Sequence, residues 1–257
     1  KGKRIVATYT RYDKKVLSDD LLIKKLKIAA KKYQQYVNND ILIVYARSKK
    51  GPFFAYEFHA GEENFQHLAG VKSPNGAVWF FNKCLDQKNP IERKDIVPKK
   101  DIKTTSSKIN ILPEAVDLTK AKAYKIGEKD LITLNCEFDI AIGNVNHILG
   151  LGKRNHLLPI PITVMDKSIY EFASSCLTIF LIMIKDEKCE KYNDIYYEIT
   201  PNIIEKANFN DEILKHISTN KTVDGVQHNS TPCIDTSDTI NIKNVFSEVA
   251  ISIEKVE

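Results

Sequence analysis

Two histidines lie close together in the N-terminal half of this sequence, and imidazole is the side chain best suited to moving protons near neutral pH. His59 ends an aromatic-rich run of β-forming residues, and Gly61 separates it from His67. Acidic residues after Gly61 suit the first turn of a helix, and Gly70 suits its end. With Phe65 on the packed face of that helix, His67 points away from it. His67 is therefore a candidate for proton transfer, although a histidine here could instead cap the helix or satisfy a buried carbonyl group.

Cations are concentrated in the first half of the chain. Residues 1–130 carry 27 Lys and Arg against 15 Asp and Glu, a net charge of +12, whereas residues 131–257 carry 11 against 18, a net charge of −7. Lysines on solvated helix faces account for part of the excess. A basic half also indicates a polyanionic partner, and nucleic acid is the commonest one.

Motifs of the common nucleotide-binding and metal-dependent enzymes are missing from the sequence. There is no GxxxxGK[ST], GxGxxG, HExxH, CxxC or GxSxG, and acidic residues do not cluster as a two-metal nuclease requires. We therefore expect no cofactor and no metal. The five cysteines are scattered, which indicates reduced thiols. No signal peptide or membrane-spanning stretch is evident, so we expect a cytoplasmic protein with no membrane contact.

Histidine and lysine together can cleave RNA without a metal. A base takes the proton of the 2′-hydroxyl, which attacks the adjacent phosphorus, and an acid protonates the leaving 5′-oxygen. Each proton transfer contributes about 10²–10⁴-fold, and a fixed cation contributes a few kcal/mol by stabilising the phosphorane oxygens.

The hydrophobic pattern predicts the elements that must position these groups. Apolar residues recur at helical spacing from Leu22 to Asn38, after an N-cap cluster at residues 18–20. Residues 40–47 and 53–59 read as a β-hairpin. A short helix is predicted at 78–85, a basic connecting loop at 87–104, and a helix containing Lys108 after a cap at 104–107. Further strands are predicted at 123–127, 131–138, 140–143, 157–165, 177–184 and 195–199, with a glycine-bearing loop at 143–156.

The run from Phe58 to Val71, Phe-x₅-Asn-Phe-x-His-Leu-x-Gly-Val, resembles the phage-associated BECR-like nucleases, which are named for barnase, EndoU, colicin nucleases and RelE. It is most similar to the PBECR4-type members. Residues 104–109 and 148–163 are similar in order and spacing. The resemblance covers roughly residues 20–200 and leaves the remainder unmatched.

This resemblance implies an α+β fold, with N-terminal helices packed on a four- to five-stranded antiparallel sheet. Residues 1–200 would form the nuclease domain, and residues 201–257 a C-terminal extension or small subdomain. It also implies a metal-independent endoribonuclease of the toxin or phage-conflict kind. RNA (tRNA or mRNA) would be the substrate, with an antitoxin or a phage or host protein as a possible partner.

The resemblance also assigns site residues. His67 would be the main acid–base residue, Lys108 the phosphate-charge stabiliser and Thr163 a hydroxyl donor on a central strand. His59 is a second proton-transfer candidate outside the family motif. Three cations are candidates for contacts to the phosphate backbone, namely Lys72, Lys153 and Arg154.

Other interpretations stay open, because likeness of fold does not establish catalysis. The chain could be a catalytically inactive interaction protein that binds nucleic acid or inhibits a partner in phage–host conflict. A DNA-acting metal nuclease is a third hypothesis, which the lack of an acidic cluster weakens. Lys108 could also be a solvated lysine and Thr163 only a strand former.

Overall fold

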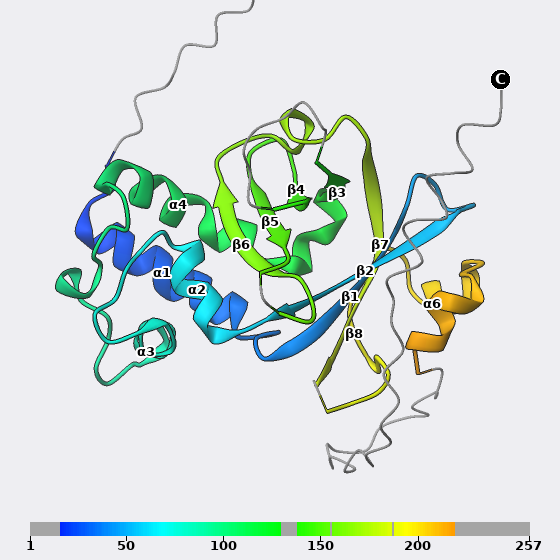
Figure 1. Ribbon diagram of the computed structural model, residues 1–257, viewed down its shortest axis with the longest axis horizontal. Coiled ribbons are helices and arrows are strands. Elements are labelled where there is room, and N and C mark those ends of the chain that lie inside the picture. Colours follow the sequence, from blue (N-terminus) through cyan, green and yellow to red (C-terminus); the bar gives the residue numbers. More distant parts are fainter. Residues whose placement is uncertain (1–15, 130–137, 155, 187, 219–257) are drawn as a thin grey trace, which may run out of the picture. The chain divides into compact units, whose positions relative to one another are not determined.

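The computed structural model describes residues 16–129, 138–154, 156–186 and 188–218 (Figure 1), which belong to the first of the two units into which the chain divides. The first helix, α1 (Asp19–Tyr33), begins after Ser18 as predicted and buries Leu22 and Leu26. It ends at Tyr33 rather than at Asn38. Asn38 has a left-handed φ of 59°, and its N–H donates to the carbonyl of Ala60. The chain thus turns before Asn38 and enters the sheet directly.

An eight-stranded, curled sheet forms the body of this unit, and every strand pairing is antiparallel. The spatial order is β2-β1-β7-β3-β4-β5-β6, and β8 pairs with β7. The predicted hairpin is confirmed as β1 and β2. The strands are β1 (Asn39–Ala46), β2 (Phe53–Ala60), β3 (Lys125–Glu128), β4 (Ile140–Gly143), β5 (Ile148–Gly152), β6 (Ile160–Met165), β7 (Cys176–Asp186) and β8 (Asp194–Glu198).

The α+β class is confirmed, but the expected four or five strands are too few. One reason is β5, which lies in the stretch predicted as a glycine-bearing loop and is buried throughout. A Cβ atom at Gly150 would lie 2.7 Å from the ring of Phe138, so that ring occupies the space a side chain would fill. Glycine here permits close packing rather than a turn. The predicted strand at 131–138 lies outside the described residues except for Phe138.

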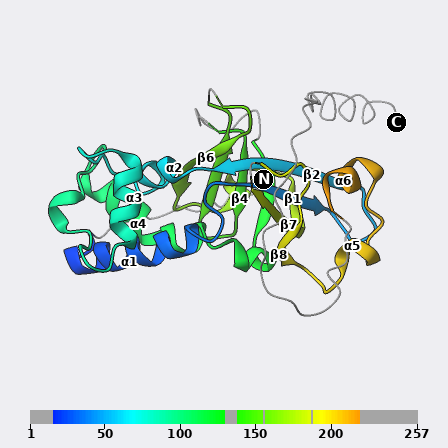
Figure 2. The same cartoon turned by 90° about the horizontal axis from the view of Figure 1, so that it is seen from below.

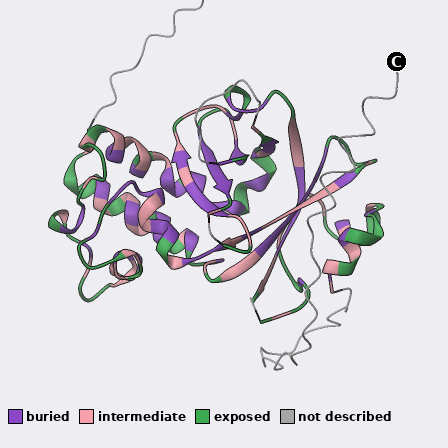
Figure 3. Ribbon diagram, viewed as in Figure 1, coloured by how far each residue is buried: buried purple, intermediate pink, exposed green. Residues whose placement is uncertain are grey.

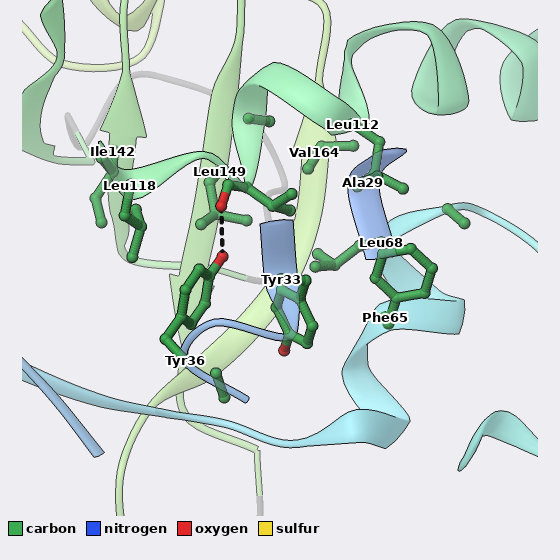
Figure 4. Close-up of a cluster of buried hydrophobic side chains, with 14 of the residues drawn as sticks. Ala29, Tyr33, Tyr36, Phe65, Leu68, Leu112, Leu118, Ile142, Leu149 and Val164 are labelled. Atoms are coloured by element: carbon green, nitrogen blue, oxygen red, sulfur yellow. Dashed lines mark hydrogen bonds between the residues drawn. The ribbon is translucent and has the colours of Figure 1, made fainter. Parts of the chain in front are cut away.

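Four helices gather on one side of the sheet (Figures 1 and 2). Beside α1 these are α2 (Glu62–Leu68), α3 (Ala77–Leu85) and α4 (Ile102–Ala115), with short 3₁₀ turns η1 (Arg93–Asp95), η2 (Leu118–Ala123) and η3 (Ile169–Glu171). Helices α2 and α4 contact β6, and α3 packs against α1 and α2. Figure 4 shows the shared core, in which Tyr33 and Phe65 from the helices meet Leu149 and Val164 from the sheet. The hydroxyl of Tyr36 donates to the carbonyl of Val116 within this core, at 2.8 Å.

The start of α4 differs from the prediction. Asp101 is the N-cap, and its carboxylate accepts hydrogen bonds from the N–H and the hydroxyl of Thr104. Thr105 and Ser106 are buried inside the helix, where the hydroxyl of Ser106 accepts the N–H of Leu17. Asp101 therefore caps the helix in place of the run at 104–107, and Lys108 lies in the second turn.

The opposite face of the sheet is covered by α5 (Ile203–Lys206) and α6 (Asp211–His216) (Figure 2). Their apolar residues pack against β1 and β7 as a second core, and Figure 3 shows these strands buried in between. The boundary at residue 200 stays a prediction, because residues after 218 lie outside the described part of the chain. Within that described part, no helix is both long enough and apolar enough to cross a membrane.

Candidate active site

The short helix α2 carries His67 beside the face that packs into the core. The side chain of Asn64 accepts the N–H of Gly61 at 2.8 Å and fixes the start of the helix. Phe65 and Leu68 are buried, whereas His67 is half-buried. The helix ends at Leu68, and Gly70 follows the C-cap as predicted, with a φ of +69° in the left-handed region. The sequence pattern therefore placed His67 on the correct face.

The carbonyl of Gly70 joins three segments. It accepts the backbone N–H of Lys99 at 3.0 Å and the hydroxyl of Thr105, from α4, at 2.9 Å. Beside it, Val71 forms a β-bridge with Pro98. The end of α2, the loop before α4 and α4 itself therefore meet at one corner.

Lys99 reaches His67 across this corner. Its Nζ lies 3.2 Å from Nδ1 of His67. The sequence placed Lys99 in a basic loop and gave it no role, because the contact depends on the pairing of two segments about 30 residues apart rather than on any local spacing. An excess of lysine in that loop was the only available signal.

Lys108 and Thr163 are also brought together, as a cation and a hydroxyl. Nζ of Lys108 donates to Oγ1 of Thr163 at 2.8 Å. A β-bulge precedes Thr163, because Gly150 pairs with Thr163 while Leu151 pairs with Pro161. Bulges re-aim neighbouring side chains. The expectation of a central strand is wrong, since β6 stands at the end of the strand order.

Gly70 also links Lys108 to the end of α2. A Cβ atom at Gly70 would lie 2.9 Å from Cδ of Lys108, so the lysine stem passes directly over this glycine. His67 lies within the last turn of the same helix, and α2 and α4 both pack against β6 (Figure 1). An imidazole, two ammonium groups and a hydroxyl thus gather around this corner.

His59 points to the other face of the sheet. Its partner in the β1–β2 register is Asp40, and Nδ1 of His59 lies 2.9 Å from the Asp40 carboxylate. Leu42, two residues after Asp40 on the same face of β1, belongs to the core beneath α5 and α6. The backbone of His59, unlike its ring, contacts the residue before β6, because its N–H donates to the carbonyl of Pro159. The structure therefore does not bring the His59 ring to His67.

Charged groups cluster around His59. Nδ1 of His216, on α6, lies 3.4 Å from the carboxylate of Glu57, and Nζ of Lys185 lies 3.9 Å from that of Asp40. Burial raises the pKa of Glu57, His216 and Lys185 oppose this, and Asp40 adds to it. This face thus holds a compact group of ion pairs where α6 meets the sheet.

The three predicted phosphate-binding cations lie in two places. Lys72 is exposed beside the corner at Gly70, where its N–H donates to the carbonyl of Val97. Lys153 and Arg154 follow β5 in the hairpin loop, beyond the pairing of Gly152 with Ile160. Of the three, Lys72 is the one that the backbone pairing holds next to the segment carrying Lys99.

Metal-ligating side chains do not gather here. Over the residues that the structure describes, no group of three or more His, Cys, Asp or Glu side chains could hold a metal ion.

A comparison with protein-family models identifies the family of this chain. The family model PBECR4, phage-Barnase-EndoU-ColicinE5/D-RelE like nuclease4, matches residues 25–200 of the 257. No curated protein and no solved structure matches the chain. The matched region spans α2, α4 and β6, and so includes every residue of the corner described above.

Proposed function

This chain belongs to the PBECR4 family of phage-Barnase-EndoU-ColicinE5/D-RelE like nucleases, and on that premise we propose that it is a metal-independent endoribonuclease. The supporting observation is the hydrogen bond between Lys108 and Thr163 beside the Gly70 corner that also carries His67. Cleavage through the 2′-hydroxyl requires proton transfer and stabilisation of the charge on the phosphorane oxygens, which an imidazole and a fixed cation can provide. The biological setting would be that of a toxin or effector in conflict between phages or mobile elements and their hosts.

Each group has a role in this reaction. His67 is the base that takes the proton of the 2′-hydroxyl and, once protonated, the acid that gives a proton to the leaving 5′-oxygen. The new bond joins O2′ to phosphorus, the bond from phosphorus to O5′ breaks, and a 2′,3′-cyclic phosphate remains. Lys108 stabilises the negative charge on the phosphorane oxygens, and Thr163 orients its ammonium group. Lys72, next to the corner, would hold a neighbouring phosphate.

The test is cleavage of purified tRNA and total RNA in the presence of EDTA. We expect fragments that end in 2′,3′-cyclic phosphate, and we expect His67→Ala to abolish them while the thermal unfolding profile is retained. His59→Gln is the matched histidine control, because its ring lies on the other face of the sheet. Failure to cleave either RNA, or a strict requirement for Mg²⁺, would contradict the proposal.

The inactive interaction protein remains the second candidate, and the net charge of −7 over residues 131–257 favours it. In that case His67→Ala leaves function unchanged, whereas truncation of the C-terminal segment abolishes it. The truncation should start after residue 218, since Ile203, Ile213 and Ile217 belong to the core that covers the sheet. Binding of an RNA or protein partner by the truncated chain is the measurement that separates the two candidates.

A further inference from the structure

We infer that Lys99 is a positioning residue that fixes the tautomer of His67. The inference rests on the proposed function of His67 and concerns a residue that the family motif does not contain. Nζ of Lys99 lies 3.2 Å from Nδ1 of His67. A lysine ammonium has three donors and no acceptor. Lys99 therefore donates, Nδ1 accepts, and the neutral ring carries its proton on Nε2.

The backbone on both sides of this contact is fixed. The N–H of Lys99 donates to the carbonyl of Gly70, three residues after His67. The bridge between Val71 and Pro98 and the bond from Lys72 to Val97 continue the pairing. An exposed lysine normally samples many rotamers, but here its Cα atom is held opposite the last turn of α2. The sequence therefore presents an ammonium group to one particular ring nitrogen.

Among the residues that the structure describes, no carboxylate pairs with this ammonium group. Lys32 pairs with Asp117, Lys94 with Glu92 and Lys120 with Glu114. For Lys99, by contrast, the described residues supply no ion-pair partner, and Nδ1 of His67 is its hydrogen-bond partner. A lysine directed to an imidazole rather than to an acid contributes little to stability. Its consequence is chemical, because it determines which nitrogen of His67 holds the proton.

Two effects on catalysis follow from this geometry. In this tautomer the Nε2–H of His67 is a donor, which is the form that can give a proton to the leaving 5′-oxygen. A bound phosphate is also a better partner for an ammonium group than a neutral imidazole is, because charge-assisted hydrogen bonds are the stronger ones. Substrate binding therefore draws Lys99 away from Nδ1, and this nitrogen then becomes able to accept a proton. Through Lys99, binding of the substrate phosphate thus makes Nδ1 of His67 able to accept a proton.

Nitrogen-15 NMR of histidine-labelled protein tests the inference directly, with His67→Gln used to assign the ring. Near pH 8, above the usual range for histidine titration (about 6.5), we expect the wild type to hold the Nε2–H tautomer. Lys99→Met should give a mixture of tautomers and Lys99→Arg should restore the single one, since a guanidinium also donates. Lys100→Met, next in the chain and exposed, should leave the spectrum unchanged. A wild-type ring protonated on Nδ1, or no response to Lys99→Met, would overturn the inference.

Kinetics add a second readout. Lys99→Met loses the charge-assisted hydrogen bond that the ammonium group makes to the substrate phosphate, which corresponds to about 10- to 100-fold. Lys99→Met should therefore lower kcat/KM to that extent, while Lys99→Arg and Lys100→Met stay near the wild type. Adding a DNA copy of the substrate, which lacks the 2′-hydroxyl, should shift the wild-type ring away from the Nε2–H tautomer. If the protein cleaves no RNA, the tautomer measurement still decides the role of Lys99. If it cleaves RNA but Lys99→Met changes neither readout, only the inference about Lys99 fails.

Discussion

Nζ of Lys108 and Oγ1 of Thr163 lie 2.8 Å apart, although 55 positions separate the two residues in the sequence. The hydroxyl accepts from the ammonium group, while its own proton is directed to the carbonyl of Val164 at 3.3 Å. This arrangement holds a long, flexible side chain against β6 and so restricts where its charge can go. A cation held in place before substrate arrives is what electrostatic stabilisation of a transition state requires.

Substitutions at this pair should therefore affect the rate more than the fold. Lys108→Met should lower RNA cleavage by about 10²–10³-fold. Thr163→Val should lower it less, and Thr163→Ser should retain most activity because it keeps the hydroxyl. Initial cleavage rates measure these effects. Lys103→Met is the control, since this lysine is exposed on the same helix. Equal rates for Lys108→Met and Lys103→Met would remove Lys108 from the site.

Gly70→Ala should damage stability and activity together. The left-handed φ of +69° costs an L-residue about 1–2 kcal/mol, and the added methyl group would also press on Cδ of Lys108. Gly76→Ala separates the two effects, because Gly76 has a φ of +93° with open space around a Cβ atom. We expect both variants to unfold at lower denaturant concentration and only Gly70→Ala to lose cleavage activity. Full activity in folded Gly70→Ala would show that the position of Lys108 is unimportant.

The raised pKa of Glu57 gives stability a defined pH dependence. Burial is its main cause, and the folded chain therefore holds this proton more tightly than the unfolded chain does. The resulting stabilisation is fully present below the ordinary value of 4.5 and is lost as the pH rises through the raised pKa. Glu57→Gln cannot titrate, so the stability of this variant relative to the wild type should be greater near pH 7 than near pH 4. Urea unfolding at both pH values measures the difference, and an equal difference at the two would contradict the assignment.

The hydroxyl of Tyr36 should contribute measurably to stability. It donates to the carbonyl of Val116 in the core, which also accepts the N–H of Leu118, so Tyr36→Phe removes one of two hydrogen bonds to that carbonyl. We expect a loss of about 1 kcal/mol in the free energy of unfolding. Tyr196→Phe removes an exposed bond to Gln35 and should change stability by less than about 0.5 kcal/mol. Similar losses in the two variants would mean that the buried bond has no special role.

Hydrophobic spacing and turn residues predicted the helices and strands whose formation depends on neighbouring residues in the sequence. The helical spacing of Leu22 and Leu26 found α1, and two runs of β-formers around a turn found the β1–β2 hairpin. β5 was missed because its glycines indicate a loop when read alone. Only the ring of Phe138, packed on Gly150, explains why a residue without a side chain fits there. This packing is a tertiary contact, which the residues around Gly150 in the sequence do not indicate.

The candidate site likewise has one part that the sequence predicted and another that depends on tertiary structure. The face of α2 that carries His67 follows from helical geometry, and the sequence predicted it. The meeting of Lys108 with Thr163 depends on a bulge in β6, and that of Lys99 with His67 on an isolated bridge. Neither irregularity produces a periodic pattern that could be read in advance. Family resemblance supplied Lys108 and Thr163, but it gave no indication of Lys99.

The position of β7 bears on when the sheet can be completed during synthesis. β1 and β3 do not pair with each other, and in the strand order β7, which ends at Asp186, lies between them and pairs with both. During synthesis the sheet therefore stays divided until most of the chain has left the ribosome. Under the proposed function, this order would keep the enzyme unassembled while the chain is still being translated.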